Sequence, residues 1–407
     1  MSAVRILRIA AGGDGVGRLE DGRAVFVPRS APGDLVEPID LRSQRRFARA
    51  RVGRVLEPGP DRIEPPCPHY VLDECGGCQL QHLAPAAQRQ ARRGIVGDAL
   101  RRLARLDAAD PELEPAAREL EYRTKITLHA DAGTGSIGLH RYGRADEVFE
   151  LRRCLITVAE LNRLWAVLAE HRRLFPRRLQ TLMLRLDRRG ECHAVFQGAR
   201  GAAWSNAAAL RDALAADGVE ATIWWREEGG EPRSVAGGGD PFPATVFEQV
   251  HPAMGDRVRA FAVDALGRAA GRLVWDLYAG IGETTAMLAS AGARVQSVES
   301  DERAVAEAEA RGPSARRLTG RVETVLGRLG APDLVVTNPP RAGMDPQVPA
   351  ELERRRPERI VYISCDPATL ARDLARLGSY RLGELRAFDL FPQTAHVETV
   401  AVLERAS

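Results

Sequence analysis

LVWDLYAGIG, at residues 273–282, is an apolar run that ends in a Gly-x-Gly turn. The run predicts a buried strand, and the two glycines let the backbone approach a bound nucleoside or amino-acid moiety closely. A second predicted strand, 293–299, ends at Glu299, about 20 residues further along, where a carboxylate can accept both hydroxyls of a ribose. Because Glu283, Thr284 and Thr285 follow the turn, the third glycine of a dinucleotide fingerprint is absent. S-adenosylmethionine therefore fits better than NAD, and the alternative is an α/β domain without a cofactor.

The stretch DLVVTNPPR, at residues 333–341, predicts a strand that ends in a rigid Pro-Pro turn. Such a turn holds Asn338 and Arg341 at the carboxyl edge of a sheet, where ligands bind in open α/β folds. Asn-Pro-Pro favours a methyltransferase that acts on a planar nitrogenous substrate, and the alternative is a loop that only caps the strand. Helices and strands alternate through 251–407, which predicts a doubly wound, Rossmann-like parallel sheet of the α/β class.

Cys365 follows another apolar run, residues 360–363, and precedes a predicted helix over 367–374. Asp366 is a suitable N-cap, and proline suits the first position of a helix. The positive end of a helix dipole favours the thiolate, which is the nucleophilic form of cysteine. The alternative interpretation is a small cysteine buried at a strand end.

Glu398 begins the last apolar run of the chain, which predicts a terminal strand. A carboxylate at the start of a strand is either an edge charge in water or a base that faces the cofactor cleft.

Three of the six cysteines are clustered in the pattern C-x7-C-x2-C, at Cys67, Cys75 and Cys78. Three thiolates in one loop need a metal to offset their repulsion, and zinc and an iron–sulfur cluster both meet that need. Cys154 is the best candidate for a fourth ligand, whereas His69 or His82 would favour zinc.

The 407-residue chain has a net charge of only +3, which argues weakly for a nucleic-acid partner. Its basic residues are almost all arginine, and Lys125 is its single lysine. No apolar run is long enough for a membrane span, and the N-terminus lacks the apolar core of a signal peptide. We therefore expect a cytoplasmic protein without membrane contact.

The chain divides into four predicted parts. Residues 1–60 have short alternating segments separated by Gly-rich turns, which predicts a small β-barrel, either an RNA-binding module or a generic one. Residues 61–95 hold the cysteine cluster. Residues 96–250 mix predicted strands and helices in a central α+β domain, and 251–407 form the cofactor-binding domain.

Taken together, these segments resemble the RNA uracil-5 methyltransferase family, in particular the iron–sulfur branch that modifies ribosomal RNA and begins with a TRAM domain. The resemblance covers nearly the whole chain. It is carried by GDGVG (13–17), the cysteine cluster with QLQH (79–82), YRTK (122–125), FEQ (247–249), DLYAGIG (276–282), NPPR (338–341), SCDPATLARD (364–373) and TAHVET (394–399).

The resemblance implies a mechanism and a set of site residues. The Cys365 thiolate would add to C6 of uracil, C5 would take the methyl group of S-adenosylmethionine, and Glu398 would remove the C5 proton. The cofactor would be bound by Gln249, Tyr278, Gly280, Gly282, Glu283, Glu299 and Asn338. A [4Fe-4S] cluster would be held by Cys67, Cys75, Cys78 and Cys154. The partner would be RNA, most simply ribosomal RNA, with the target base flipped out or already unpaired. The protein itself would be a monomer.

The chain departs from the family pattern at several positions. Asp is usual at Asn338, and Asn is usual at Glu283, His251 and Asp366. Three alternatives stay open at this point. The substrate is transfer RNA, or the Asn-Pro-Pro motif serves an amino-methyltransferase acting on adenine or glutamine, or the chain is a non-enzymatic RNA-binding protein with a zinc knuckle.

Overall fold

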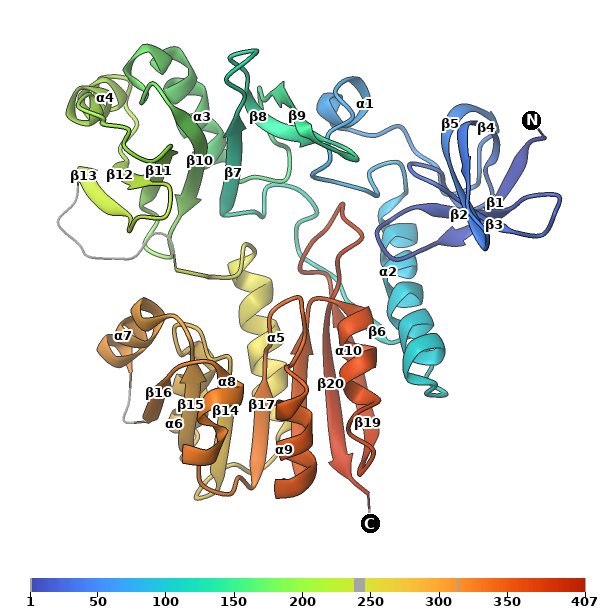
Figure 1. Ribbon diagram of the computed structural model, residues 1–407, viewed down its shortest axis with the longest axis vertical. Helices are drawn as coiled ribbons and strands as arrows, with labels where there is room; N and C mark the ends of the chain where they lie inside the picture. The colour runs from blue at the N-terminus through green and yellow to red at the C-terminus, as the bar shows by residue number, and fades with distance from the viewer. Residues whose placement is uncertain (1, 238–245, 313–314, 407) are drawn as a thin grey trace.

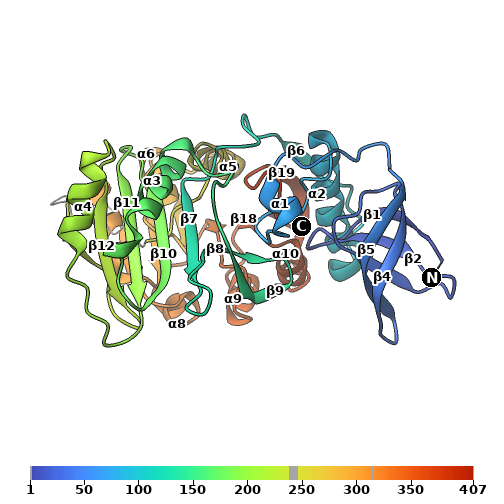
Figure 2. The ribbon, with the colours of Figure 1, turned by 90° about the horizontal axis from the view of Figure 1, so that it is seen from above.

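The computed structural model describes residues 2–237, 246–312 and 315–406. An N-terminal barrel, a central sheet and a C-terminal sheet are joined by a segment of loops and helices that carries the clustered cysteines (Figure 1). Seen from above, the barrel and the central sheet lie at opposite ends of the molecule (Figure 2). Within the described ranges, no helix has both the length and the apolar character needed to cross a bilayer.

The barrel forms because apolar residues alternate along short strands. In its first strand Val4 and Ile6 are buried, while Arg5 and Leu7 are exposed. Pairing of the first strand with the fourth closes the barrel. The strands are β1 (Val4–Ile9), β2 (Gly15–Arg18), β3 (Ala24–Val27), β4 (Leu35–Ser43) and β5 (Phe47–Glu57). The small β-barrel predicted at the N-terminus is thus confirmed.

The central domain is a seven-stranded sheet with two main helices packed against it. Its strand order is β13-β12-β11-β10-β7-β8-β9. The strands are β7 (Lys125–Ala130), β8 (Ile137–Arg141), β9 (Arg144–Glu150), β10 (Leu179–Leu186), β11 (Cys192–Gly198), β12 (Thr222–Glu227) and β13 (Arg233–Ala236). The helices are α3 (Ala159–Glu170), the short η2 (Arg172–Leu174) and α4 (Ala207–Ala216). The predicted mixture of helices and strands is confirmed for this region.

The C-terminal sheet has eight strands in the order β16-β15-β14-β17-β18-β20-β19-β6. The strands are β6 (Glu112–Glu114), β14 (Leu273–Leu277), β15 (Arg294–Glu299), β16 (Arg316–Thr319), β17 (Leu334–Thr337), β18 (Arg359–Ser364), β19 (Tyr380–Phe388) and β20 (Glu398–Arg405). The helices are α5 (Pro252–Ala265), α6 (Glu283–Ser290), α7 (Glu302–Arg311), α8 (Val322–Val325), η3 (Leu326–Arg328), α9 (Gln347–Arg355) and α10 (Pro367–Leu374).

Helices cover both faces of this sheet, which is why its central strands are mostly apolar and buried along nearly their whole length. Neighbouring residues of one strand therefore enter different cores: Trp275 packs in one and Val274 in the other. Strands β14 to β18 are parallel, and the strand order reverses between β14 and β17. A doubly wound, Rossmann-like fold is confirmed, and its ligand site is expected at the carboxyl edge beside this reversal.

Strand β20 runs antiparallel to β18, and this direction places its first residue at the functional edge of the sheet. Ser364, at the end of β18, is paired with Thr399. Cys365 and Glu398 therefore leave adjacent strands at the same edge, although many residues separate them in the chain.

Residues 96–116 pack with the C-terminal sheet, although the predicted boundary placed them in the central domain. The helix α2 (Pro85–Ala99) continues into one π-helical turn, η1 (Leu100–Ala104), and both bury side chains in a core of the C-terminal sheet. The short strand β6 (Glu112–Glu114) pairs in parallel with β19. A three-residue strand carries too little pattern to be recognised in sequence, so this addition to the sheet edge went unpredicted.

Candidate active site

A single cavity of about 1240 Å³ lies between the carboxyl edge of the C-terminal sheet, the central domain and the cysteine segment. Figure 1 shows that this edge faces the other two parts. The cavity wall includes residues from each predicted group: the Gly-x-Gly turn, the Asn-Pro-Pro turn, Cys365, Glu398, and the three clustered cysteines with Cys154. Tertiary folding thus brings the predicted site residues to one cavity, except Gly282, which belongs to the same turn as Gly280 but does not line the wall. Gln249, which follows the central domain, lines the same wall.

At the cofactor end, the turn after β14 has a backbone shape that favours glycine. Gly280 and Gly282 have φ angles of +55° and +77°, and a Cβ on Gly282 would lie 2.9 Å from Ala308 Cβ. Glu299 Oε2 accepts a hydrogen bond from Gly280 N (2.9 Å). This bond ties the predicted ribose-binding carboxylate to the predicted cofactor turn.

Tyr278 also has a positive φ angle, +62°, which is uncommon for a residue with a side chain. Its hydroxyl is buried at the cavity without a hydrogen-bond partner in the described residues. Nearby, Thr285 donates a hydrogen bond to the buried Asp276 (2.5 Å), and burial raises the pKa of Asp276 to about 7. The unpartnered hydroxyl is a polar group that a bound ligand would satisfy.

Glu283, an unusual residue for its position, is held by two arginines. Its carboxylate lies 2.8 Å from Arg188 of the central domain and 3.0 Å from Arg259 of α5. Both arginines also contact Asp256, so the four side chains form one ion-pair network between two domains. These partners offset the negative charge that the substitution of Asn by Glu adds.

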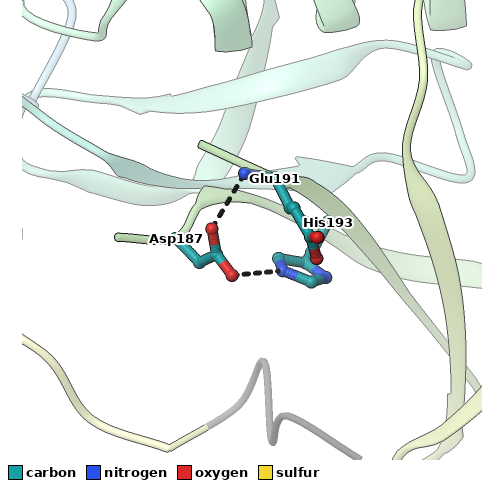
Figure 3. Close-up of side chains that lie close together, drawn as sticks. All are labelled: Asp187, Glu191 and His193. Carbon is teal, nitrogen blue, oxygen red and sulfur yellow. Dashed lines mark hydrogen bonds and ion pairs between the residues drawn. The ribbon is translucent and has the colours of Figure 1, made fainter. Parts of the chain in front are cut away.

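A hairpin turn presents Arg188 to this network. Asp187 Oδ1 accepts hydrogen bonds from the N–H groups of Arg189 (2.9 Å) and Glu191 (2.8 Å). Its other oxygen lies 3.5 Å from His193 Nε2 (Figure 3). Asp187, Glu191 and His193 offer potential ligand atoms within 4.8 Å of one another. The Asp187 bonds to backbone N–H groups are those that stabilise a tight turn, so we assign this group to the turn.

At the catalytic end, Cys365 lies between β18 and α10 as predicted, but its pKa is not lowered. The Asp366 carboxylate accepts hydrogen bonds from Ala368 N and Thr369 N, both 2.9 Å, and so occupies the positive end of the helix. Burial raises the pKa of the Cys365 thiol to about 11, and the Glu398 carboxylate adds to this increase, while Arg341 opposes it. The expectation of a helix-stabilised thiolate was therefore wrong for the protein without RNA.

Glu398 is buried, with only 1% of its surface exposed. Burial raises the pKa of its carboxyl to about 8, against the opposing effect of Arg341. Its Oε2 has no hydrogen-bond partner among the described residues. The interpretation of Glu398 as an edge charge in water is thereby excluded, and its position at the cavity suits proton transfer near neutral pH.

The three clustered cysteines and Cys154 also line the cavity. Burial raises the pKa of Cys75 to about 12 and also raises those of Cys67 and Cys78, with the neighbouring thiols adding to the effect. These thiols would ionise only with a metal present. In the described chain, no three of their sulfur atoms lie within 4.8 Å of one another. Three thiolates on one zinc ion would be about 3.8 Å apart.

The two histidines near the cysteines have other partners. His69 Nδ1 lies 2.7 Å from Asp73, and its Nε2 accepts a hydrogen bond from Arg152 N (3.1 Å). His82 Nδ1 lies 2.8 Å from the Tyr70 hydroxyl. Because both ring nitrogens of His69 are engaged, it does not serve as a fourth ligand in this arrangement.

Comparison with known proteins identifies the family. The chain is 32% identical to an uncharacterised RNA methyltransferase of Streptomyces coelicolor, covering 99% of this chain and 93% of the relative. It is 33% identical to another from Gloeobacter violaceus, covering 99% and 96%. Residues 314–406 match the family model described as tRNA (Uracil-5-)-methyltransferase. The chain belongs to the RNA uracil-5 methyltransferase family.

A solved structure shows that the methyltransferase fold extends over the whole chain. The tRNA (uracil-54, C5)-methyltransferase of Pyrococcus abyssi, in complex with S-adenosyl-L-homocysteine, superposes with a TM-score of 0.72 at 23% identity. The alignment covers 98% of this chain and 100% of that one. This likeness supports the three-part arrangement around the cavity as a property of the fold.

Membership in this methyltransferase family brings S-adenosylmethionine as the cofactor. The open turn at Gly280, the unpartnered Tyr278 hydroxyl and the Glu299 carboxylate fit a nucleoside with an amino-acid tail. Asn338 donates its backbone N–H to Leu277 O (3.1 Å) and lies on the same wall.

Two residues of this methyltransferase site escaped the sequence analysis. Arg188 and Arg259 hold Glu283, yet neither stands in a recognisable motif. In a chain with so many arginines, their type alone carried no signal. Only the approach of the β10–β11 turn and of α5 to the start of α6 selects them.

Proposed function

We propose that the protein transfers the methyl group of S-adenosylmethionine to C5 of a specific uridine in RNA, through a covalent bond between Cys365 and C6. The observation that carries this proposal is the pairing of Cys365 and Glu398 at one cavity, from adjacent strands, beside the cofactor turn. A simple transfer to nitrogen needs neither a thiol nor a buried carboxylate at that place. This argues against an amino-methyltransferase.

The proposed steps balance as follows. The Cys365 thiol loses its proton to solvent water and its sulfur adds to C6 of uracil, while the electron pair of the C5–C6 double bond passes to the C4 carbonyl as an enolate. C5 then takes the methyl group from the sulfonium, which leaves S-adenosylhomocysteine. Glu398 removes the C5 proton, the double bond re-forms, and the Cys365 sulfur leaves as thiolate. Arg341, which opposes the pKa increases of both Cys365 and Glu398, is placed to balance the negative charge that moves between them.

We also propose the residues that hold each group. S-adenosylmethionine is assigned to Gln249, Tyr278, Gly280, Gly282, Glu283, Glu299 and Asn338. A [4Fe-4S] cluster is assigned to Cys67, Cys75, Cys78 and Cys154, supported by their soft ligand set and by a sulfur spacing too wide for one zinc ion. Gly77 N lies 3.4 Å from Cys75 Sγ, and N–H groups near ligating sulfurs tune such clusters.

RNA is the proposed partner. Arg123 and Lys125 bring positive charge to the cavity from the central domain, and the exposed arginines of β4 and β5 bring it to the barrel. We assign the barrel, residues 1–60, as TRAM-like, 61–95 as the cluster segment, 96–250 as the RNA-binding domain, apart from 96–116, which pack with the C-terminal sheet, and 251–407 as the methyltransferase domain. Ribosomal RNA is the proposed substrate. Transfer RNA is the second candidate, because the structurally similar Pyrococcus abyssi protein is named as a tRNA (uracil-54, C5)-methyltransferase.

The decisive experiment traps the covalent intermediate with RNA containing 5-fluorouridine. After methyl transfer, fluorine at C5 cannot leave as a proton does, so the adduct persists. We expect the wild-type protein to form an adduct that survives denaturation and Cys365→Ala to form none. Cys192→Ala is the matched control, because Cys192 does not line the cavity. An adduct of equal yield with Cys365→Ala would overturn the mechanism.

The substrate RNA is tested separately. Mass mapping of 5-methyluridine in ribosomal and transfer RNA from a deletion strain should show one ribosomal site that has lost its methyl group. Loss at a transfer-RNA site instead would select the second candidate.

A further inference from the structure

The loop between β19 and β20, residues 389–397, forms one wall of the catalytic end. Phe391, Thr394 and His396 line the cavity together with Cys365 and Glu398. A flipped base that reaches Cys365 must therefore pack against this loop. The shape of the loop decides how well C6 of the base meets the sulfur.

We propose that Gln88 is a positioning residue, which holds this wall in its working shape through Gln393. The inference rests on the proposed function for its catalytic meaning, but the clamp itself is a statement about the protein without RNA. Gln88 lies in α2, 305 residues from Gln393. It touches neither Cys365 nor the cofactor wall.

The two glutamines exchange hydrogen bonds. Gln88 Nε2 donates to Gln393 Oε1 (3.0 Å) and to Leu83 O (3.0 Å), and Gln88 Oε1 accepts from Gln393 N (3.1 Å). Both side chains are buried, with 3% and 5% of their surface exposed. Buried amides need partners, so removing one leaves the other unsatisfied.

The cysteine segment holds the other side of Gln393. Gln393 O accepts hydrogen bonds from Gln79 N (3.2 Å) and Leu80 N (3.0 Å), and Gln79 Oε1 accepts one from Ala395 N (3.4 Å). Gln79 directly follows Cys78 in the chain. The segment that carries the cysteines therefore reaches the catalytic wall through backbone hydrogen bonds.

Gln393 needs this support because its backbone is unfavourable. Its φ angle is +71°, in the left-handed region that residues with a side chain rarely adopt. Such a conformation persists only where the surroundings impose it, and it is common beside functional sites. Hydrogen bonds to its N–H, its carbonyl and its side chain provide the restraint.

Three further contacts hold the loop. Arg92, also in α2, forms a buried ion pair with Asp389 (2.9 Å) and donates to Thr394 O (3.1 Å). The Tyr122 hydroxyl donates to Pro392 O (2.9 Å). Residues outside the loop's own domain thus hold the wall in place. Gln88 is the one that contacts Gln393, the residue with the unfavourable backbone.

The test replaces Gln88 by methionine, which has a similar volume but no amide. Gln88→Met should form the 5-fluorouridine adduct roughly 10- to 100-fold more slowly, since small displacements of reacting groups have effects of this size. Its dissociation constant for S-adenosylhomocysteine should stay within about twofold, because Gln88 does not line the cofactor wall. Gln90→Met is the matched control, on the exposed face of the same helix, and should behave as wild type.

A readout without RNA tests the clamp alone. Hydrogen exchange at residues 391–397 should accelerate in Gln88→Met and not in Gln90→Met. Wild-type trapping together with unchanged exchange would overturn the clamp. If the wild-type protein itself formed no adduct, the proposed function would fail, while the exchange result would still decide the clamp. Gln88→Asn, which keeps a shorter amide, replaces the methionine variant if the latter does not fold.

Discussion

At the cofactor end of the cavity, Glu299 is held by backbone N–H groups of its own strand end and of the neighbouring turn. At the catalytic end, the wall beside Glu398 is held by α2 and the cysteine segment, which lie some 300 residues away in the chain. Contacts between neighbouring segments hold the first end, whereas contacts between distant segments of the chain hold the second. The comparison teaches that a short motif can specify a cofactor turn, whereas a reactive pocket depends on distant parts of the chain.

The largest effect is expected at Cys365. Cys365→Ala should lower methyl transfer to RNA by at least about 1,000-fold, since the other four cysteines of the cavity are assigned to the cluster and none is left to form the covalent bond. The cofactor end is separate, so binding of S-adenosylhomocysteine should persist in calorimetry. Loss of both would contradict the independence of the two ends.

Glu398→Gln should reduce turnover by roughly 100- to 1,000-fold, the usual range for loss of a general base. The amide cannot remove the C5 proton, but addition and methyl transfer precede that step. A covalent adduct should therefore accumulate even with ordinary uridine RNA, visible as a shifted band after denaturation. Slow turnover without an adduct would place Glu398 earlier in the reaction.

The pH dependence of turnover should reflect the buried carboxyl. The pKa of Glu398 is raised to about 8, so below that pH the group is protonated and cannot act as base. Turnover on ordinary RNA should rise about tenfold per pH unit below pH 8, and above pH 8 it should no longer depend on this group. Adduct formation with 5-fluorouridine RNA stops before the proton step and should lack this inflection. An inflection shared by both reactions would assign it to another group.

The smallest effect is expected at the cofactor end. Glu283→Gln removes the charge that pairs with Arg188 and Arg259, and should weaken binding of S-adenosylhomocysteine by roughly three- to tenfold. At saturating cofactor, the rate of adduct formation should stay near that of wild type. Glu309→Gln, on an exposed position of α7, is the matched control. A loss of trapping rate at saturating cofactor would show that the two ends are coupled through this network.

Much of the fold was readable from sequence because its signals are local. Apolar runs, the Gly-x-Gly turn and the alternation in β1 predicted the C-terminal fold and the barrel. The three-residue strand β6 and the inclusion of η1 in the C-terminal core were not predicted, since both depend on what the chain packs against. The proposed site residues stand in motifs, whereas Gln88, Arg188 and Arg259 stand in none.

The sequence by itself determined which chemical groups the protein possesses and which short segments present them: a thiol after a strand, a carboxylate before one, and glycines in a turn. Only the tertiary structure decided their state. It shows Cys365 with a raised pKa because burial removes water from the thiol and the Glu398 and Asp366 carboxylates lie nearby. It also shows Gln393 held by residues that no local pattern links to it. Burial and long-range hydrogen bonds arise only when distant segments meet. The motifs therefore identify the reactive groups, and the packing determines their pKa values and their geometry.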